Sequence, residues 1–230
     1  MSNFRSLLKG QSDVISAVLI LVIAIGLVGT AYVWGIPLIQ KRQDSAYSDR
    51  VDSYFDQSGM SIVGKISTIA ANGGEDTFTS DVSGIWTLNP CVDAVDTSCA
   101  QQPYYNFENN SLEFSFFSTV SQYGVGQGWI TLSSTDPCPS PSANVGQNPY
   151  VVCVRSDTNG NGYNVTFKVQ FRELDTSDDT QGFKIVLIPT IPNLNTSTAN
   201  SIKISRGNVF STIDSSGKTL IVTEVNILLG

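Results

Sequence analysis

The sequence predicts an α+β protein in which a long hydrophobic N-terminal helix is followed by an all-β sandwich head. Two observations lead to this fold class. Residues 14–40 contain no charged side chain, and an apolar run of that length suits a helix rather than a strand. Beyond Gly59 the apolar residues change from helical spacing to alternation with polar residues, which is typical of strands with one buried face.

The apolar run is long enough to cross a membrane. As a helix, Val14 to Ile39 covers ~39 Å, and the hydrocarbon core of a bilayer is ~30 Å thick. The run is too long for the hydrophobic part of an ordinary secretory signal, and it is followed by Gln40, Lys41 and Arg42 rather than by the small residues of a cleavage site. It therefore predicts a single-pass membrane span.

The helical pattern continues beyond the span as an amphipathic helix. Apolar side chains recur at helical spacing at Ile39, Tyr47, Val51, Tyr54 and Phe55. Pro37 predicts a kink or a locally melted turn, because proline removes one backbone hydrogen bond and crowds the preceding turn. We therefore expect a helical segment over residues 11–58 and a separate head domain over residues 59–230.

The residues before the span form a short basic leader. The leader MSNFRSLLKG carries Arg5 and Lys9 and ends in Gly10, and Gln11 opens the helix. This arrangement resembles the class III signal peptide of archaeal type IV pilins and archaellins, which a prepilin peptidase cuts after the glycine. The resemblance implies that residues 1–10 are removed by a cut between Gly10 and Gln11. Unlike bacterial pilins, which begin with Phe and carry Glu at the fifth mature position, this chain has Gln11 and Ile15 there.

The head is expected to consist of short strands. In Tyr163 to Leu174, Val165, Phe167 and Val169 alternate with polar residues such as Lys168, which predicts one buried and one solvent-facing side. Similar patterns predict further strands at Ser61–Ala70, Val82–Leu88, Ser111–Val120, Trp129–Ser133, Tyr150–Arg155, Phe183–Ile188, Ser201–Ser205 and Leu220–Leu228. With the resemblance above, they imply an immunoglobulin-like, pilin-type sandwich.

All four cysteines lie beyond the membrane segment. Their spacings and the absence of histidine do not suit a zinc site. We expect two disulfides that close local loops, Cys91 with Cys99 and Cys138 with Cys153, and hence an oxidising compartment. Three sequons fit that location and make Asn109, Asn164 and Asn195 candidate glycosylation sites.

One hexamer matches the opening of a calcium loop. Asp157, Asn159 and Asn161 lie in D-T-N-G-N-G, and their oxygens are candidate ligands for a hard cation. The twelfth position is Lys168, where an EF-hand needs a bidentate Glu. A Gly/Asn hairpin turn between two strands is therefore the favoured interpretation, and we expect no metal.

Composition excludes several classes of function. The chain has no histidine, which excludes Ser-His-Asp and Cys-His catalysis. Its net charge is -7. No Lys or Arg lies between Lys65 and Arg155, so we expect no nucleic-acid partner. No catalytic or nucleotide-binding motif is recognisable, so we predict no enzyme and no cofactor. A glycosidase built on two carboxylates stays open as an alternative.

The resemblance implies a structural subunit of an archaeal type IV pilus-like filament that polymerises through its N-terminal helix and serves adhesion. The implied partners are further copies of the chain, the prepilin peptidase, a pilus assembly ATPase with its membrane platform, and surface glycans or other cells. The location would be an extracellular filament reached through a transient single-pass membrane precursor. An archaellin is the alternative within the family, and a membrane-tethered binding protein or a minor pseudopilin is the alternative outside polymers.

Overall fold

The structure, a computed structural model, divides the chain into two units. It describes residues 3–56, 58–91, 109–132, 138, 145–146, 148–175, 180–213 and 217–230, with no side-chain description for 3–13, 145–146 and 175. The first unit is Met1–Asp44 and the second is Ser45–Gly230. The second unit thus begins inside the long helix, whose last turns belong to the head.

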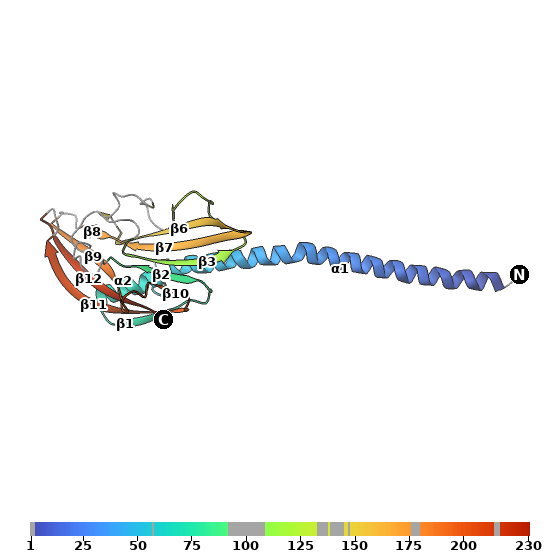
Figure 1. Cartoon of the computed structure of the whole chain (residues 1–230), viewed down its shortest axis with the longest axis horizontal. Helices are drawn as coiled ribbons and strands as arrows, with labels where there is room; N and C mark the ends of the chain where they lie inside the picture. The colour runs from blue at the N-terminus through green and yellow to red at the C-terminus, as the bar shows by residue number, and fades with distance from the viewer. Residues whose placement is uncertain are drawn as a thin grey trace. The chain divides into compact units, whose positions relative to one another are not determined.

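Helix α1 (Asn3–Tyr54) is continuous over 52 residues and contains Pro37 (Figure 1). A melted turn at Pro37 is therefore absent: the helix continues through the proline, although Pro37 cannot donate to the carbonyl of Val33. The predicted kink remains a prediction. The helix also includes residues 3–10, the predicted leader. Its end at Tyr54 is four residues before the predicted one.

Helix α2 (Ile62–Asn72) replaces the strand predicted at Ser61–Ala70, and that prediction was wrong. The β-branched residues of this segment favour a strand, but Ile62, Ile66 and Ile69 recur at helical spacing and are all buried. The ends are also capped: the Ser61 side chain accepts from the Gly64 N–H, and Gly73, at φ 79°, donates its N–H to Ile69 O. Burial of one helix face outweighs the strand propensity.

The head contains two six-stranded sheets, as the predicted sandwich requires (Figure 1). In sheet A the order is β1 (Glu75–Thr79), β11 (Ser201–Ile213), β12 (Thr219–Leu229), β9 (Gln181–Pro189), β8 (Glu173–Asp175) and β5 (Val145–Gly146). In sheet B it is β10 (Thr196–Ser197), β2 (Ile85–Asn89), β3 (Ser111–Ser118), β7 (Gly162–Phe171), β6 (Tyr150–Asn159) and β4 (Ile130–Thr131). The pairs β12–β9 and β5–β8 are parallel, and the other described pairs are antiparallel.

One hydrophobic core joins both sheets, α2 and the last turns of α1. Val51 and Tyr54 of α1 belong to this core. Phe55, directly after the helix, is fully buried, and its ring stacks on Phe167 of β7 at 5.7 Å and lies 6.1 Å from Trp86 of β2. Ile66 of α2 and Ile204 of β11 belong to the same cluster. The end of α1 is therefore a part of the head's core rather than a linker.

The predicted solvent-facing side of β7 is wrong, because that side is buried too. Lys168 is 1% exposed, and Thr166 and Gln170 are also buried. The ammonium of Lys168 lies 3.0 Å from a carboxylate oxygen of Glu113 and 5.2 Å from the centre of the Trp129 ring. A charged side chain is tolerated there because it is paired and covered.

Sheet A has a second buried face as well. On it, Val186, Leu220 and Val222 form a small apolar cluster with Cys91, and Lys184, which pairs across the strands with both Val222 and Glu173, is 2% exposed. Burial lowers the pKa of Lys184 to about 7.

Replacing Phe55 with alanine is expected to destabilise the head by about 3–5 kcal/mol, because a fully buried ring leaves a cavity between the helix and sheet B. Denaturant unfolding of the full chain in detergent, followed by tryptophan fluorescence, measures the change. Tyr47→Ala, in the last turns of α1, is the matched aromatic control, since Tyr47 is 46% exposed; it should change stability by less than about 0.5 kcal/mol. Equal effects of the two variants would contradict the packing.

Lys184 should make stability depend on pH above neutrality. Its pKa is about 7 in the folded chain and about 10.4 when unfolded, so the unfolded chain binds more protons between these values and stability should rise as the pH increases from about 7 to about 10. In Lys184→Met this contribution should disappear, and the variant's advantage over the unmodified chain should shrink over that range. Unfolding midpoints at pH 6, 8 and 10 measure it; a constant difference would contradict the burial of the amine.

Candidate functional site: the apolar helix

The apolar part of α1 is exposed along its whole length. From Val14 to Ile39 the large hydrophobic side chains are between 45% exposed, at Ile36, and 72% exposed, at Trp34. Within the described residues α1 is the helix long and apolar enough to cross a membrane; a buried core helix would pass the same test, but this window is 0% buried. Apolar surface on this scale is unfavourable in water, so the segment requires a lipid or protein environment.

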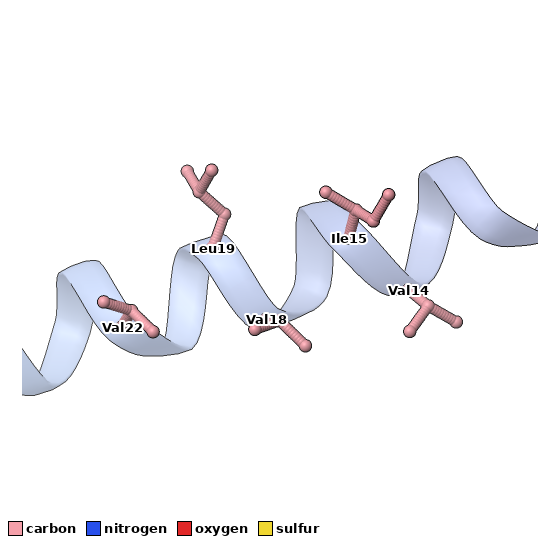
Figure 2. A pocket seen from close by; sticks show the side chains of 5 residues that line it. All are labelled: Val14, Ile15, Val18, Leu19 and Val22. Carbon is pink, nitrogen blue, oxygen red and sulfur yellow. The ribbon is translucent and has the colours of Figure 1, made fainter.

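The exposed surface is aliphatic near the start of the described side chains. Figure 2 shows Val14, Ile15, Val18, Leu19 and Val22 extending from the helix ribbon on more than one side. They line an open hollow of about 370 Å³ that contains no polar side chain. Such a surface can receive lipid chains or the aliphatic side chains of another helix, but it offers no group for catalysis.

The glycines of α1 are not required by the chain's own packing. A Cβ added at Gly26, Gly29 or Gly35 would meet nothing within 4 Å, although glycine lowers helix stability. Thr30, the polar side chain in this stretch, donates to Gly26 O at 2.7 Å, so its hydroxyl is satisfied within the helix. A close approach by another helix would explain why the residues are small.

The predicted cleavage site lies in the helical part of the chain. Gly10 and Gln11 are both within α1, and their side chains are outside the description. The cut between them therefore remains a prediction.

The last turns of α1 are attached to the head by polar contacts as well as by the core. The Tyr54 hydroxyl donates to the Asp81 carboxylate and accepts from the Asp81 and Val82 N–H groups at 3.0 and 3.2 Å. Arg50 forms an ion pair with the same carboxylate. The Tyr54 hydrogen bond, followed by the charge of Arg50, lowers the pKa of Asp81, while burial raises the pKa of Tyr54.

The cysteine prediction is confirmed where the structure describes it. Cys138 and Cys153 form a disulfide with their Cα atoms 6.1 Å apart, and Cys153, on β6, is fully buried. Cys91 is also disulfide-bonded. Its predicted partner, Cys99, lies outside the described residues, so that pairing remains a prediction.

The three sequons differ in accessibility. Asn109 and Asn164 are exposed, and Asn164 accepts a hydrogen bond from the Asn159 side chain at 3.0 Å. Asn195 is half-buried, and its side-chain oxygen is buried without a hydrogen-bond partner. Folded geometry thus favours a glycan at Asn109 or Asn164 over one at Asn195, while glycosylation itself remains a prediction.

The calcium-like hexamer is a hairpin turn between β6 and β7, as the favoured interpretation holds. Asn159 pairs with Gly162, and Gly160 and Asn161 form the two-residue turn, with Gly160 at φ 58°. Asp157 forms an ion pair with Arg155 at 2.8 Å, and Lys168 lies far along β7. Among the described residues, no group of three or more His, Cys, Asp or Glu side chains could hold a metal ion.

Two further features of the head, an aromatic loop and a hollow beside sheet A, bear on ligand binding. In the aromatic loop Tyr123 to Trp129, Tyr123 packs edge-on against Phe167 at 5.6 Å, and the Trp129 ring lies 4.7 Å from the Arg155 guanidinium. The loop at residues 103–105 is outside the described residues. A hollow of about 220 Å³ between α2 and sheet A brings no pair of described carboxylates together; its lining is Ser67, Ala70, Ala71, Pro149, Phe183, Lys184, Ile185, Ile221 and Thr223.

Comparison of the chain with protein-family models, with curated proteins and with solved structures finds no match. The feature that bears on function is therefore in the chain's own residues: an exposed apolar helix whose last turns are anchored in a disulfide-bonded β head. The bond between Tyr54 and Asp81 could not be predicted from the sequence, because the two residues are 27 positions apart and Tyr54 fits an apolar helix position equally well.

The Cys138–Cys153 disulfide should stabilise the head. Because it closes a loop with a sequence separation of 15, Cys138→Ser with Cys153→Ser is expected to lower the free energy of unfolding by about 3 kcal/mol. Thermal or denaturant unfolding of the full chain under oxidising conditions measures the loss. Adding a reductant should lower the stability of the unmodified chain by at least as much, and should have a smaller effect on the double variant; equal effects would contradict a structural role.

Proposed function

We propose that the chain is a structural subunit of an archaeal type IV pilus-like extracellular filament that polymerises through its N-terminal helix. One observation carries the proposal: α1 is a single helix whose apolar stretch is exposed while its last turns are buried in the head. A simple membrane anchor needs only the apolar stretch and tolerates a flexible linker. A polymer subunit needs a helix fixed to its head, so that packing of helices also positions heads.

The leader supports the same proposal. Arg5, Lys9 and Gly10 precede Gln11 in the order that a prepilin peptidase site requires, and cleavage there would remove the basic residues and keep the helix. A pilus assembly ATPase with its membrane platform would then move the helix from lipid into a bundle of helices. Burial of the apolar side chains against neighbouring helices, worth ~25 cal/mol per Å² relative to water, would offset the loss of contact with lipid.

The head suits the outer surface of such a filament. It is held by at least one disulfide, which is typical of proteins outside the cytoplasm, and it presents exposed sequons at Asn109 and Asn164. Adhesion to surface glycans or to other cells is the proposed use. The Ala- and Val-rich helix start associated with archaellins is absent, which favours a pilus over a swimming filament.

The experiment is to read the N-terminus of the protein made in an archaeal host. Mass spectrometry should give Gln11 as the first residue, and electron microscopy should show filaments. Gly10→Trp should block the cut and abolish filaments, because the uncut basic leader stays at the membrane. Ser6→Ala, in the same leader, is the control and should change neither result.

Two results would contradict the proposal. A mature N-terminus other than Gln11 would remove the pilin-type processing. An uncut Gly10→Trp chain that still reaches the surface and binds cells would favour the alternative, a tethered binding protein or minor pseudopilin.

A further inference from the structure

Two cations, Lys41 and Arg42, directly follow the apolar stretch of α1. Lys41 and Arg42 are exposed and take part in no ion pair or hydrogen bond within the part of the chain that the structure describes. They lie just beyond Ile39, the last residue of the apolar run. The proposed helix bundle would therefore bring these cations close to neighbouring copies.

Two acids lie further along the same helix, and a third follows its end. Asp49 and Asp52 are exposed and share one face by their spacing of three residues, and Asp56 is exposed two residues beyond Tyr54, where α1 ends. Arg50 is the nearest cation in sequence, and it is already paired with Asp81 outside the helix. Burial raises the pKa of Asp52, and the charges of Asp49 and Asp56 raise it further, so the negative charges repel one another.

The spacing relates the two groups of charges. Arg42 and Asp49 of α1 are seven residues apart, and a spacing of seven places residues on nearly the same side of a helix. Two parallel helices side by side without a stagger would place each charge next to its own copy, cation by cation and acid by acid. A stagger of about seven to ten residues, or ~10–15 Å along the axis, places the cations of one helix beside the acids of the next.

An antiparallel pair can also bring Arg42 next to Asp49, but it does not cover the apolar surface. In that arrangement the two apolar stretches run in opposite directions away from the charged region, so Val14–Ile39 of each copy stays exposed. A parallel staggered pair satisfies both requirements. Charge complementarity and the uncovered apolar surface therefore favour the same occupant, a second copy of this chain.

We propose that neighbouring copies pack their α1 helices in parallel with this stagger, so that Lys41 and Arg42 of one copy pair with Asp49 and Asp52 of the next. This inference depends on the proposed polymerisation and adds its register. The apolar side chains supply the affinity, and the ion pairs select one register among those that the featureless aliphatic surface would allow.

The test is charge reversal followed by mixing of mature chains that begin at Gln11, made in the archaeal host. Lys41→Glu/Arg42→Glu and Asp49→Lys/Asp52→Lys are each solubilised in detergent, then diluted below the micellar concentration, and polymer is measured by sedimentation and electron microscopy. Each variant alone should yield at least tenfold less polymer than the unmodified chain. An equimolar mixture should recover most of the polymer, because each contact then joins opposite charges again.

The controls separate the possible causes. Lys203→Glu and Glu75→Lys reverse the charges of an exposed ion pair on the head and should polymerise normally. Unfolding midpoints close to that of the unmodified chain confirm that the heads are folded. If the unmodified mature chain forms no polymer in this assay and no filaments in the archaeal host, the proposed function is wrong. If it polymerises and either charge-reversed variant does so equally well, or the mixture shows no recovery, the register is wrong and the polymerisation stands.

Cross-linking gives a second readout that does not depend on a charge-reversed chain. Chains with Arg42→Cys mixed with chains with Asp49→Cys should form an interchain disulfide under mild oxidation of the polymer. Either variant by itself should cross-link far less, because equal positions are ~10 Å or more apart along the axis in the staggered register. Strong cross-linking of Arg42→Cys with itself would show an unstaggered packing and overturn the inference.

Discussion

The structure depends on one constraint: the apolar stretch of α1 is too long and too hydrophobic to remain in water. Every large hydrophobic residue from Val14 to Ile39 is exposed in the part of the chain that the structure describes, and the free energy of apolar side chains falls when they leave water. The helix must therefore lie in lipid, against other chains, or in each at successive stages.

The head is built to hold the end of that helix rigidly. Phe55 is part of the same core as both sheets, and Tyr54 and Arg50 share the carboxylate of Asp81. A hydrophobic contact alone allows a helix to rotate about its axis, whereas the directional bonds of Tyr54 oppose rotation. Rotation of α1 within the head is thus restricted, which is what a subunit needs if the packing of its helix is to determine where its head lies.

The sequence predicted the elements that depend on local pattern and missed those that depend on distant neighbours. The long helix, the strand periodicity of β7 and the Cys138–Cys153 pair follow from spacing along the chain. The helix at Ile62–Asn72 was missed because its β-branched residues fit a strand equally well until their common burial is known. The burial of Lys168 was missed because it depends on Glu113 and Trp129, which come from other strands.

The division of charge along the chain would let one helix serve in the two environments of the proposed function. Residues 14–40 carry no charge, whereas the next sixteen residues carry Lys41 and Arg42 first and then four acids with Arg50 among them. If the charges were spread along the helix, entry into lipid would be costly; if they were absent, an aliphatic bundle could slide from one register to another. With the charges just beyond the apolar run, the free-energy cost of inserting the membrane segment into lipid stays low, and charged side chains are still available for contacts at the end of that segment. The register of a polymer would then be determined at the edge of the helix bundle, close to the anchored turns that connect it to the head.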